Sequence, residues 1–312
     1  MKGQTVNPAR GILFMLIAVA LFSVMVAFIK IASGHVPTGQ SVFFRSAFAL
    51  PVILIWLARR GDLGTGLKVK NPMGHFWRGF IGTTAMALGF AALAYLPLPE
   101  VTAIGFTAPL LTVVFAAMFL GETVRAFRLT AVGIGLFGVM VVLWPRLTIF
   151  GGGSASDAAT LGVMLVLGSA VFKALAQIHI RKLVQSEQTS AIVFYFSLTA
   201  TCLSLLTLPF GWVMPTGPEC AYLIGAGLIG GVAQIFLTSS YRFAPASVVA
   251  PFDYSAMLFA LVIGYVWFDE VPTLLMLVGA SIIIFAGVLI IWRERQLGLK
   301  RGKARPGVTP QG

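Results

Sequence analysis

The feature that most constrains this chain is a series of long stretches with almost no charged residues. A transmembrane helix needs about 20 mostly apolar residues, and the sequence holds ten stretches of roughly that length. Only 10% of the residues are charged, too few to cover a water-facing surface. We therefore predict an all-α integral membrane protein with ten transmembrane helices. The expected spans are residues 11–32, 39–58, 76–96, 99–120, 127–145, 160–181, 190–210, 219–239, 245–267 and 272–292.

The basic residues predict the orientation of these spans. Of the 22 Lys and Arg residues, all but four fall on the membrane side shared by the two termini, and Arg78 is counted with that side. Arg146 falls on the opposite side, and Lys30, Arg45 and Lys173 fall inside spans. The positive-inside rule then places both termini in the cytoplasm. Because this clustering explains the net charge of +12, we expect no nucleic-acid partner.

The two halves of the chain share aromatic, proline and acidic landmarks at a nearly constant spacing. In the first half these are Tyr95, Pro99, Glu122, Phe137 and Trp144, and in the second half Tyr241, Pro245, Glu270, Phe285 and Trp292. Each half carries five spans, and this odd number forces the second half to enter the membrane upside down. We therefore predict two inverted five-helix repeats, an arrangement typical of transporters.

The repeat predicts four segments along the chain. Residues 10–146 form the first repeat and residues 160–293 the second. Residues 147–159 contain a Gly- and Ser-rich run and are expected to be a linker. The basic residues 294–312 are expected to form a disordered cytoplasmic tail. The first span is longer than the apolar part of a signal peptide, about 7–15 residues, so we expect it to be retained.

Charged side chains at membrane depth are costly and mark candidate functional residues. Asp253 lies well inside its predicted span, about 12 Å deep, and Lys173 lies at a similar depth from the same face. The two side chains could form a substrate or proton site at the bundle centre. They could also form a structural ion pair, or the lysine could extend toward the headgroups. The sequence leaves these alternatives open.

Two further basic residues lie in the opposite part of the membrane. Arg45 lies about 9 Å from the outer face and could bind an anionic group of a substrate or pair with Glu100. Lys30 lies close to the outer end of the first span, and we expect its ammonium group to extend to the outer headgroups.

Uncharged candidates are Gln177, Gln234, Tyr254 and Phe106. The first three carry hydrogen-bonding groups where lipid offers no partners, so they either line a cavity or bond another helix. Phe106, next to a kink expected at Pro109, could form an aromatic wall or could serve as ordinary packing. We expect no metal or cofactor, since the three histidines lack metal-ligand spacing. Matches to G-x-G-x-x-G fall inside predicted spans, where they favour tight helix packing instead of nucleotide binding.

With these features in view, the chain resembles a drug/metabolite transporter superfamily member with two EamA-type domains, over about residues 10–293. The residues that carry the resemblance are Phe44-Arg45, Tyr95 to Pro99, Ala108-Pro109, Gly121-Glu122, Tyr241 to Pro245 and Asp269-Glu270. Four motifs resemble the branch that includes bacterial riboflavin importers of the RibN type and S-adenosylmethionine uptake carriers. They are Leu21-Phe-Ser23, Phe43-Phe-Arg45, Arg78-Gly79 and Phe106-Thr-Ala-Pro109.

The resemblance implies a ten-helix inverted repeat around a central cavity, lined mainly by helices one, three, four, six, eight and nine. Those helices carry Lys173, Gln177, Gln234, Asp253, Tyr254 and Phe106. The two halves are not chemically equivalent, because Arg45 has no counterpart in the seventh span. Glu122 also follows Gly, whereas Glu270 follows Asp.

We expect a secondary transporter of a small organic metabolite in the bacterial inner membrane, working by alternating access. Riboflavin uptake is the leading expectation, and export or exchange of amino acids, S-adenosylmethionine or other metabolites is the alternative. A membrane-embedded enzyme on lipid-linked substrates would need converging acid, base or metal ligands, which the carboxylate positions do not provide. The expected partners are the solute and the lipid bilayer, and a homodimer stays open.

Overall fold

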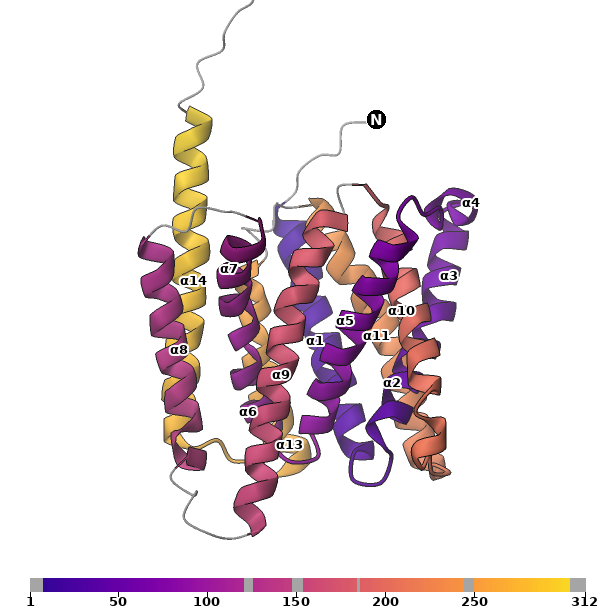
Figure 1. Ribbon diagram of the computed structural model, residues 1–312, viewed down its shortest axis with the longest axis horizontal. Helices are drawn as coiled ribbons and strands as arrows, with labels where there is room; N and C mark the ends of the chain where they lie inside the picture. Colours follow the sequence, from indigo (N-terminus) through magenta and orange to yellow (C-terminus); the bar gives the residue numbers. More distant parts are fainter. Residues whose placement is uncertain (1–7, 121–125, 148–153, 184–185, 244–249, 304–312) are drawn as a thin grey trace, which may run out of the picture.

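The structure, a computed structural model, describes residues 8–120, 126–147, 154–183, 186–243 and 250–303 (Figure 1). Every regular element in these ranges is a helix, so the predicted all-α fold is confirmed for them. The first half contains α1 (Pro8–Ala32), α2 (Thr38–Ala47), α3 (Ala49–Arg59), α4 (Leu63–Gly66), α5 (Pro72–Ala92), α6 (Leu98–Gly105), α7 (Thr107–Leu120) and α8 (Ala126–Leu147). The second half contains α9 (Ser154–Leu183), α10 (Thr189–Leu205), η1 (Leu208–Phe210), α11 (Gly217–Phe243), η2 (Ala250–Ser255), α13 (Ala256–Phe268) and α14 (Leu274–Lys303).

Three predicted spans are interrupted helices. Residues 39–58 divide into α2 and α3 at Phe48, and residues 99–120 divide into α6 and α7 at Phe106. Each break lies three residues before a proline, Pro51 or Pro109, whose missing N–H removes the helical hydrogen bond to the preceding turn. The third interruption is the 3-10 helix η2, which precedes α13 within residues 245–267.

Two boundaries differ from the expected segments. The α9 helix begins at Ser154, upstream of the apolar run and inside the stretch expected to be a linker. At the other end, α14 continues as a helix to Lys303, although we expected disorder after Arg293. This segment is rich in Arg, Lys, Leu and Gln, all good helix formers, so the helix extends past the apolar stretch. The predicted landmarks Glu122 and Pro245 lie outside the described residues.

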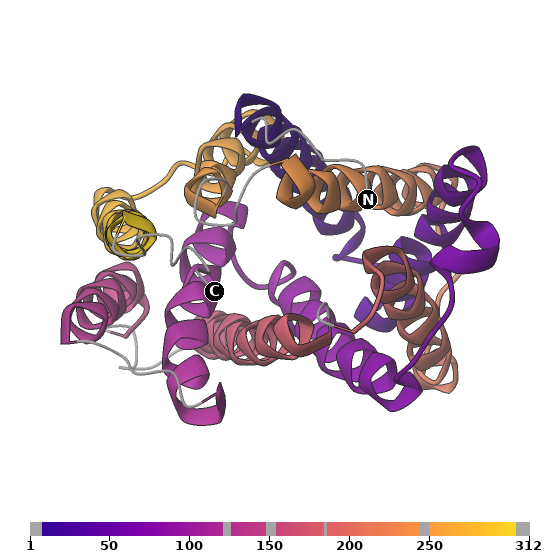
Figure 2. The same ribbon diagram turned by 90° about the horizontal axis from the view of Figure 1, so that it is seen from above.

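The long helices run side by side, and α1 begins on the same side of the bundle on which α14 ends (Figure 1). We refer to this side as the termini side and to the other as the distal side. Seen from above, α8 and α14 pair at one end of an elongated outline, and the remaining helices form a ring (Figure 2).

The helix contacts recur when the two halves are exchanged. The first predicted span packs on the eighth (α1 on α11), and the sixth packs on the third (α9 on α5). Spans two and seven also pack together (α2 on α10), as do spans five and ten (α8 on α14).

Glycines allow the closest of these contacts. A Cβ atom at Gly138 of α8 would lie 2.9 Å from the Gly279 carbonyl oxygen of α14, and one at Gly279 would lie 2.7 Å from the Gly138 oxygen. On α11, a Cβ atom at Gly227 would lie 2.7 Å from the Phe44 carbonyl oxygen. One glycine of each G-x-G-x-x-G match, Gly138 and Gly227, therefore packs against a neighbouring helix, as expected for small residues in lipid.

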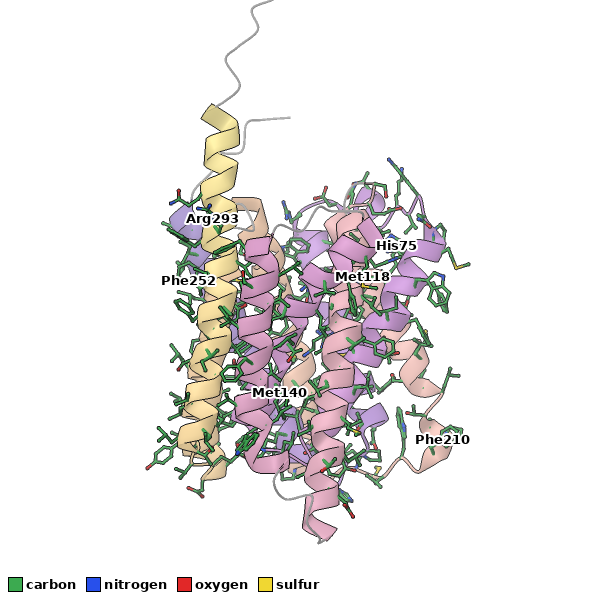
Figure 3. All side chains as sticks on the ribbon, turned by 60° about the vertical axis from the view of Figure 1, so that its left-hand side comes forward. His75, Met118, Met140, Phe210, Phe252 and Arg293 are labelled. Atoms are coloured by element: carbon green, nitrogen blue, oxygen red, sulfur yellow. The ribbon has the colours of Figure 1, made fainter. Side chains whose placement is uncertain are left out.

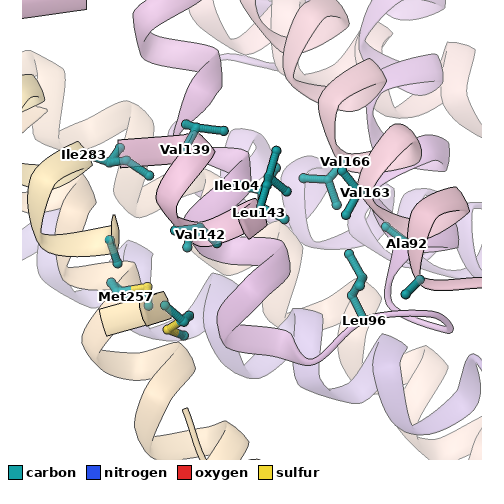
Figure 4. Packing of buried hydrophobic residues seen from close by; sticks show 14 residues of the cluster. Ala92, Leu96, Ile104, Val139, Val142, Leu143, Val163, Val166, Met257 and Ile283 are labelled. Carbon is teal, nitrogen blue, oxygen red and sulfur yellow. The ribbon is translucent and has the colours of Figure 1, made fainter. Parts of the chain in front are cut away.

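The largest buried cluster joins both halves at the distal part of the bundle (Figure 4). Leu96, Ile104 and Leu143 of the first half meet Val163 and Met276 of the second half there. Large apolar side chains are also exposed on the outside, as suits a lipid-facing perimeter. Four described helical segments, one of them formed by α2 and α3 together, are long and apolar enough to cross a membrane: Ala9–Ala32, Thr38–Arg59, Asp157–Ile180 and Gly217–Leu237.

Candidate functional site

Two interrupted helices, one from each half, meet through an aromatic pair. The Phe106 ring at the α6–α7 break lies 5.0 Å from the Tyr254 ring of η2, centroid to centroid, at an interplanar angle of 57°. Tyr254 is buried, and its ring end lies against Gly287 of α14, where a Cβ atom would overlap the hydroxyl. Hydroxyl groups reinforce both irregular segments, since Thr107 Oγ1 donates to the Ile104 oxygen and Ser255 Oγ to the Phe252 oxygen, each at 2.6 Å.

Asp253 and Lys173, the two charged candidates of the second half, lie on different elements, η2 and α9. Asp253 immediately precedes Tyr254, and Lys173 and Gln177 lie one turn apart on α9. All three side chains are solvent-accessible.

The structure does not join Lys173 and Asp253 as an ion pair, although both residues lie in its described part. Ser169, one turn before Lys173, donates to the Ala85 carbonyl oxygen of α5 at 2.6 Å and fixes the rotation of α9. Gln234, on α11, is partly exposed. The two charges thus remain separately accessible.

Lys30 differs from the expectation that it extends to the headgroups. Its Nζ lies 2.7 Å from Glu270 Oε1 and donates to the Leu96 carbonyl oxygen at 2.9 Å. The other carboxylate oxygen accepts the Leu98 backbone N–H at 2.8 Å. Only 11% of the Lys30 side chain and 16% of the Glu270 side chain are exposed. The ammonium group stays inside because a carboxylate and a carbonyl oxygen replace its water of hydration. The ion pair between Lys30 and Glu270 links the two halves of the chain at the distal side.

His75 of α5 lies beside a second buried carboxylate. It is buried near the termini side (Figure 3), with Nε2 3.6 Å from Glu187 Oε2. Glu187 Oε1 accepts the backbone N–H groups of Lys70 at 2.8 Å and Asn71 at 2.6 Å. Burial raises the pKa of the Glu187 carboxyl, but the two backbone hydrogen bonds and the nearby His75 outweigh it and hold that pKa below its usual value.

Arg45 is buried on α2, with 5% of its surface exposed, and its Cζ lies 5.6 Å from the centre of the Phe196 ring. The expected pair with Glu100 is absent from the described contacts of Arg45, and Nε has no hydrogen-bond partner. Arg78, which loop charge assigned to the cytoplasmic side, turns inward to the same ring. The sequence held one signal for this, namely Gly82 one turn later, which leaves room beside the side chain.

The matches to known proteins agree with this geometry. Residues 9–144 and 160–293 match the EamA-like transporter family. The chain is 31% identical over 284 residues to the pseudopaline exporter CntI of Pseudomonas aeruginosa, covering 90% of this chain and 95% of that one. It is 29% identical over 303 residues to a riboflavin transporter of Vibrio cholerae, covering 96% and 98%.

A third relative is an S-adenosylmethionine uptake transporter of Rickettsia prowazekii, 26% identical over 290 residues with 92% and 94% covered. A solved crystal structure matches with a TM-score of 0.66 at 21% identity, covering 93% of this chain and 99% of that chain, which supports the fold. The resemblance to the drug/metabolite transporter superfamily is confirmed, and the family and these relatives point away from an enzyme. The chain belongs to the EamA-like transporter family.

Proposed function

We propose that this protein is a secondary transporter that moves a small organic metabolite across the bacterial inner membrane by alternating access. The observation that carries the proposal is the contact between Phe106 and Tyr254. It joins an interrupted helix of one half to an interrupted helix of the other. Transporters with internal repeats place their substrate sites at such junctions, near the membrane midplane. Asp253 and Lys173, both solvent-accessible, supply polar groups for a substrate or a coupling proton.

The proposal includes ten spans in two inverted repeats, with residues 10–146 and 160–293 as the repeats. The helix contacts support it, because α1 on α11 and α9 on α5 exchange when the halves are exchanged. The shared side of the α1 start and the α14 end supports placing both termini in the cytoplasm (Figure 1). Rocking of one half against the other would then expose the interior residues to each side in turn.

Riboflavin uptake is the first substrate and direction to test. The support is similarity to riboflavin transporters of Vibrio cholerae and Rhizobium johnstonii, at 29% and 28% identity. The aromatic pair and the amides of Gln177 and Gln234 suit a flat ring with polar edges. Export is the second candidate, supported by the similarity to the pseudopaline exporter.

Purified protein in liposomes tests transport directly. We expect labelled solute to accumulate or exchange only in liposomes that contain the protein. A riboflavin auxotroph grown on limiting external riboflavin tests the substrate. If growth is not rescued despite confirmed membrane expression, riboflavin uptake is removed from the proposal. Export and other solutes are then tested in the liposome assay.

A further inference from the structure

Two arginines from different helices converge on one aromatic ring. Arg45 Cζ of α2 lies 5.6 Å and Arg78 Cζ of α5 lies 4.2 Å from the centre of the Phe196 ring of α10. The three helices pack against one another in pairs. Both distances end at the same point, so the two guanidinium carbons are no farther apart than the sum of the distances. The two positive charges are close enough to repel each other.

The two side chains approach the ring from opposite sides of the membrane. Arg45 lies about 10 Å from the distal end of the segment Thr38–Arg59, and Arg78 lies about 9 Å from the termini-side start of α5, at 1.5 Å per residue. Phe196 lies near the middle of α10, between the two levels. A group bound between the arginines would therefore contact elements that face both membrane sides.

Neither arginine has a counter-charge among the described residues. Neither takes part in an ion pair, and the Nε atoms of both and Nη1 of Arg78 are buried without an acceptor. On the same helices, the hydroxyl groups of Ser46 and Thr83 are also buried without partners. Buried guanidinium groups normally bind carboxylates or carbonyl oxygens. The Phe196 ring attracts a cation, but it leaves these N–H groups without an acceptor.

The backbone leaves room for the charged groups where they meet. A Cβ atom at Gly82, one turn after Arg78, would overlap Arg78 Nη1 and would lie 2.8 Å from Phe196 Cε2. On α11, a Cβ atom at Gly230 would lie 3.6 Å from Arg45 Nε. An alanine at Gly82 would fill the space that the Arg78 guanidinium group now occupies beside the ring.

We propose that Arg45 and Arg78, which share the Phe196 ring, form a subsite that binds the anionic group, a carboxylate or a phosphate, of the transported solute. With N···O distances of about 2.9 Å, an anion held between two guanidinium groups separates their carbons by roughly 8 Å, which lies within the upper limit set by the two ring distances. The inference rests on the proposed transport function and narrows it to an organic anion. Because riboflavin is uncharged at neutral pH, the subsite favours an anionic solute over riboflavin.

Anion binding to purified protein in a neutral detergent tests the subsite without a transport assay. The probes are benzoate, phenyl phosphate and the neutral benzamide, measured by titration calorimetry and by the shift in unfolding temperature. We expect the two anions to bind and to raise the unfolding temperature, and benzamide to bind at least tenfold more weakly. Arg45→Gln and Arg78→Gln should each weaken anion binding at least tenfold. Arg60→Gln is the matched control, because Arg60 is exposed and also stacks on an aromatic ring, Trp56.

Three results overturn the subsite. They are anion binding that is unaffected in both variants, anion binding no tighter than benzamide binding, and no anion binding at all. Phosphatidylglycerol added to the detergent separates a lipid headgroup from a soluble anion. If this lipid displaces benzoate from wild type and loses its own binding in both variants, the subsite belongs to a lipid and the assignment to the solute is wrong.

The ligand-free variants supply a second readout. Removing one of two repelling, unpartnered charges should leave the unfolding temperature unchanged or raise it, whereas a structural guanidinium–ring contact predicts a fall. A clear fall in both variants overturns the inference. Transport in liposomes is scored separately. If the variants lose anion binding but the wild-type protein moves no solute, only the transport function is wrong. If the wild-type protein transports solute but the variants bind anions normally, only the subsite is wrong.

Discussion

Two buried cationic sites among the described residues, that of Lys30 and that of Arg45 with Arg78, differ in how their positive charge is neutralised. Lys30 has a carboxylate at 2.7 Å and a carbonyl acceptor at 2.9 Å, so its positive charge is matched within the fold. Arg45 and Arg78 lie against one ring and have buried N–H groups without acceptors. A buried cation with its hydrogen-bond and ion-pair partners in place contributes to the stability of the folded bundle. Buried cations without partners are destabilising until an anion arrives, which is the property expected of a binding site.

The largest loss of stability should come from removing the counter-charge of Lys30, so that this cation, like Arg45 and Arg78, is buried without an anionic partner. Glu270→Ala leaves the Lys30 ammonium buried without its carboxylate and removes the hydrogen-bond acceptor of the Leu98 N–H. We expect a loss of about 3–5 kcal/mol in the free energy of unfolding. Thermal or denaturant unfolding in detergent measures it.

The double variant Lys30→Met with Glu270→Ala should recover part of that loss, as in a double-mutant cycle. Asp62→Ala is the control, because its pair with Arg60 spans 3.9 Å between side chains that are 39% and 52% exposed. It should change stability by less than about 1 kcal/mol. Equal losses in Glu270→Ala and Asp62→Ala would show that the distal ion pair does not hold the halves together.

The second test concerns the accessible acid. Asp253→Asn keeps the size of the side chain and removes its charge. We expect solute uptake in liposomes to fall at least tenfold, or to lose its pH dependence, while the protein still inserts and unfolds at the wild-type temperature. Unchanged transport with an unchanged pH profile would make Asp253 structural.

A smaller effect should follow from Gly82→Ala, which changes the space beside Arg78 without removing the charge of Arg45 or Arg78. The added methyl group displaces the Arg78 guanidinium from beside Phe196. Benzoate affinity should therefore fall about three- to tenfold, which corresponds to about 0.7 to 1.4 kcal/mol. Gly105→Ala is the control, since a Cβ atom there meets nothing within 4 Å. Wild-type affinity in Gly82→Ala would contradict the geometry of the subsite.

The smallest effect is expected at Glu187, a second carboxylate whose partners are complete. Its pKa is lower in the folded protein than the usual value of about 4.3. The carboxylate therefore contributes stability above pH of about 4 to 5, and this contribution is lost as pH falls through the folded-state pKa. Glu187→Gln should be about 1 kcal/mol less stable than wild type at pH 7, with the difference shrinking below about pH 4. Unfolding curves from pH 3 to 7 measure it, and a constant difference over that range would contradict the assignment.

Much of the helix pattern could be predicted from local sequence. Apolar length placed the long helices, and the glycines of α11 and α8 predicted close packing because a missing Cβ is a local property. The breaks at Phe48 and Phe106 follow from Pro51 and Pro109, although only the second proline was expected to bend its helix. The helical extension to Lys303 shows that a charged composition does not by itself end a helix.

The candidate site was only partly predictable. Phe106 and Tyr254 were both candidates, yet nothing in the sequence indicated that their rings touch. The sequence left open whether Lys173 and Asp253 form an ion pair, and the described ion pairs do not include them. Arg78 was counted as a loop charge, because span prediction gives depth and loop side but not the direction of a long side chain.

By itself, the sequence determined that the chain is an apolar, all-helical protein with two related halves and few charges at membrane depth. These are properties of composition and of spacing along the chain. Only the tertiary structure decided which charges are neutralised. The acceptor of the Leu98 N–H lies 172 residues away, on Glu270, and the ring that Arg45 and Arg78 share lies on a third helix. Partners that are distant in sequence are selected by helix rotation and packing, and those depend on the whole bundle.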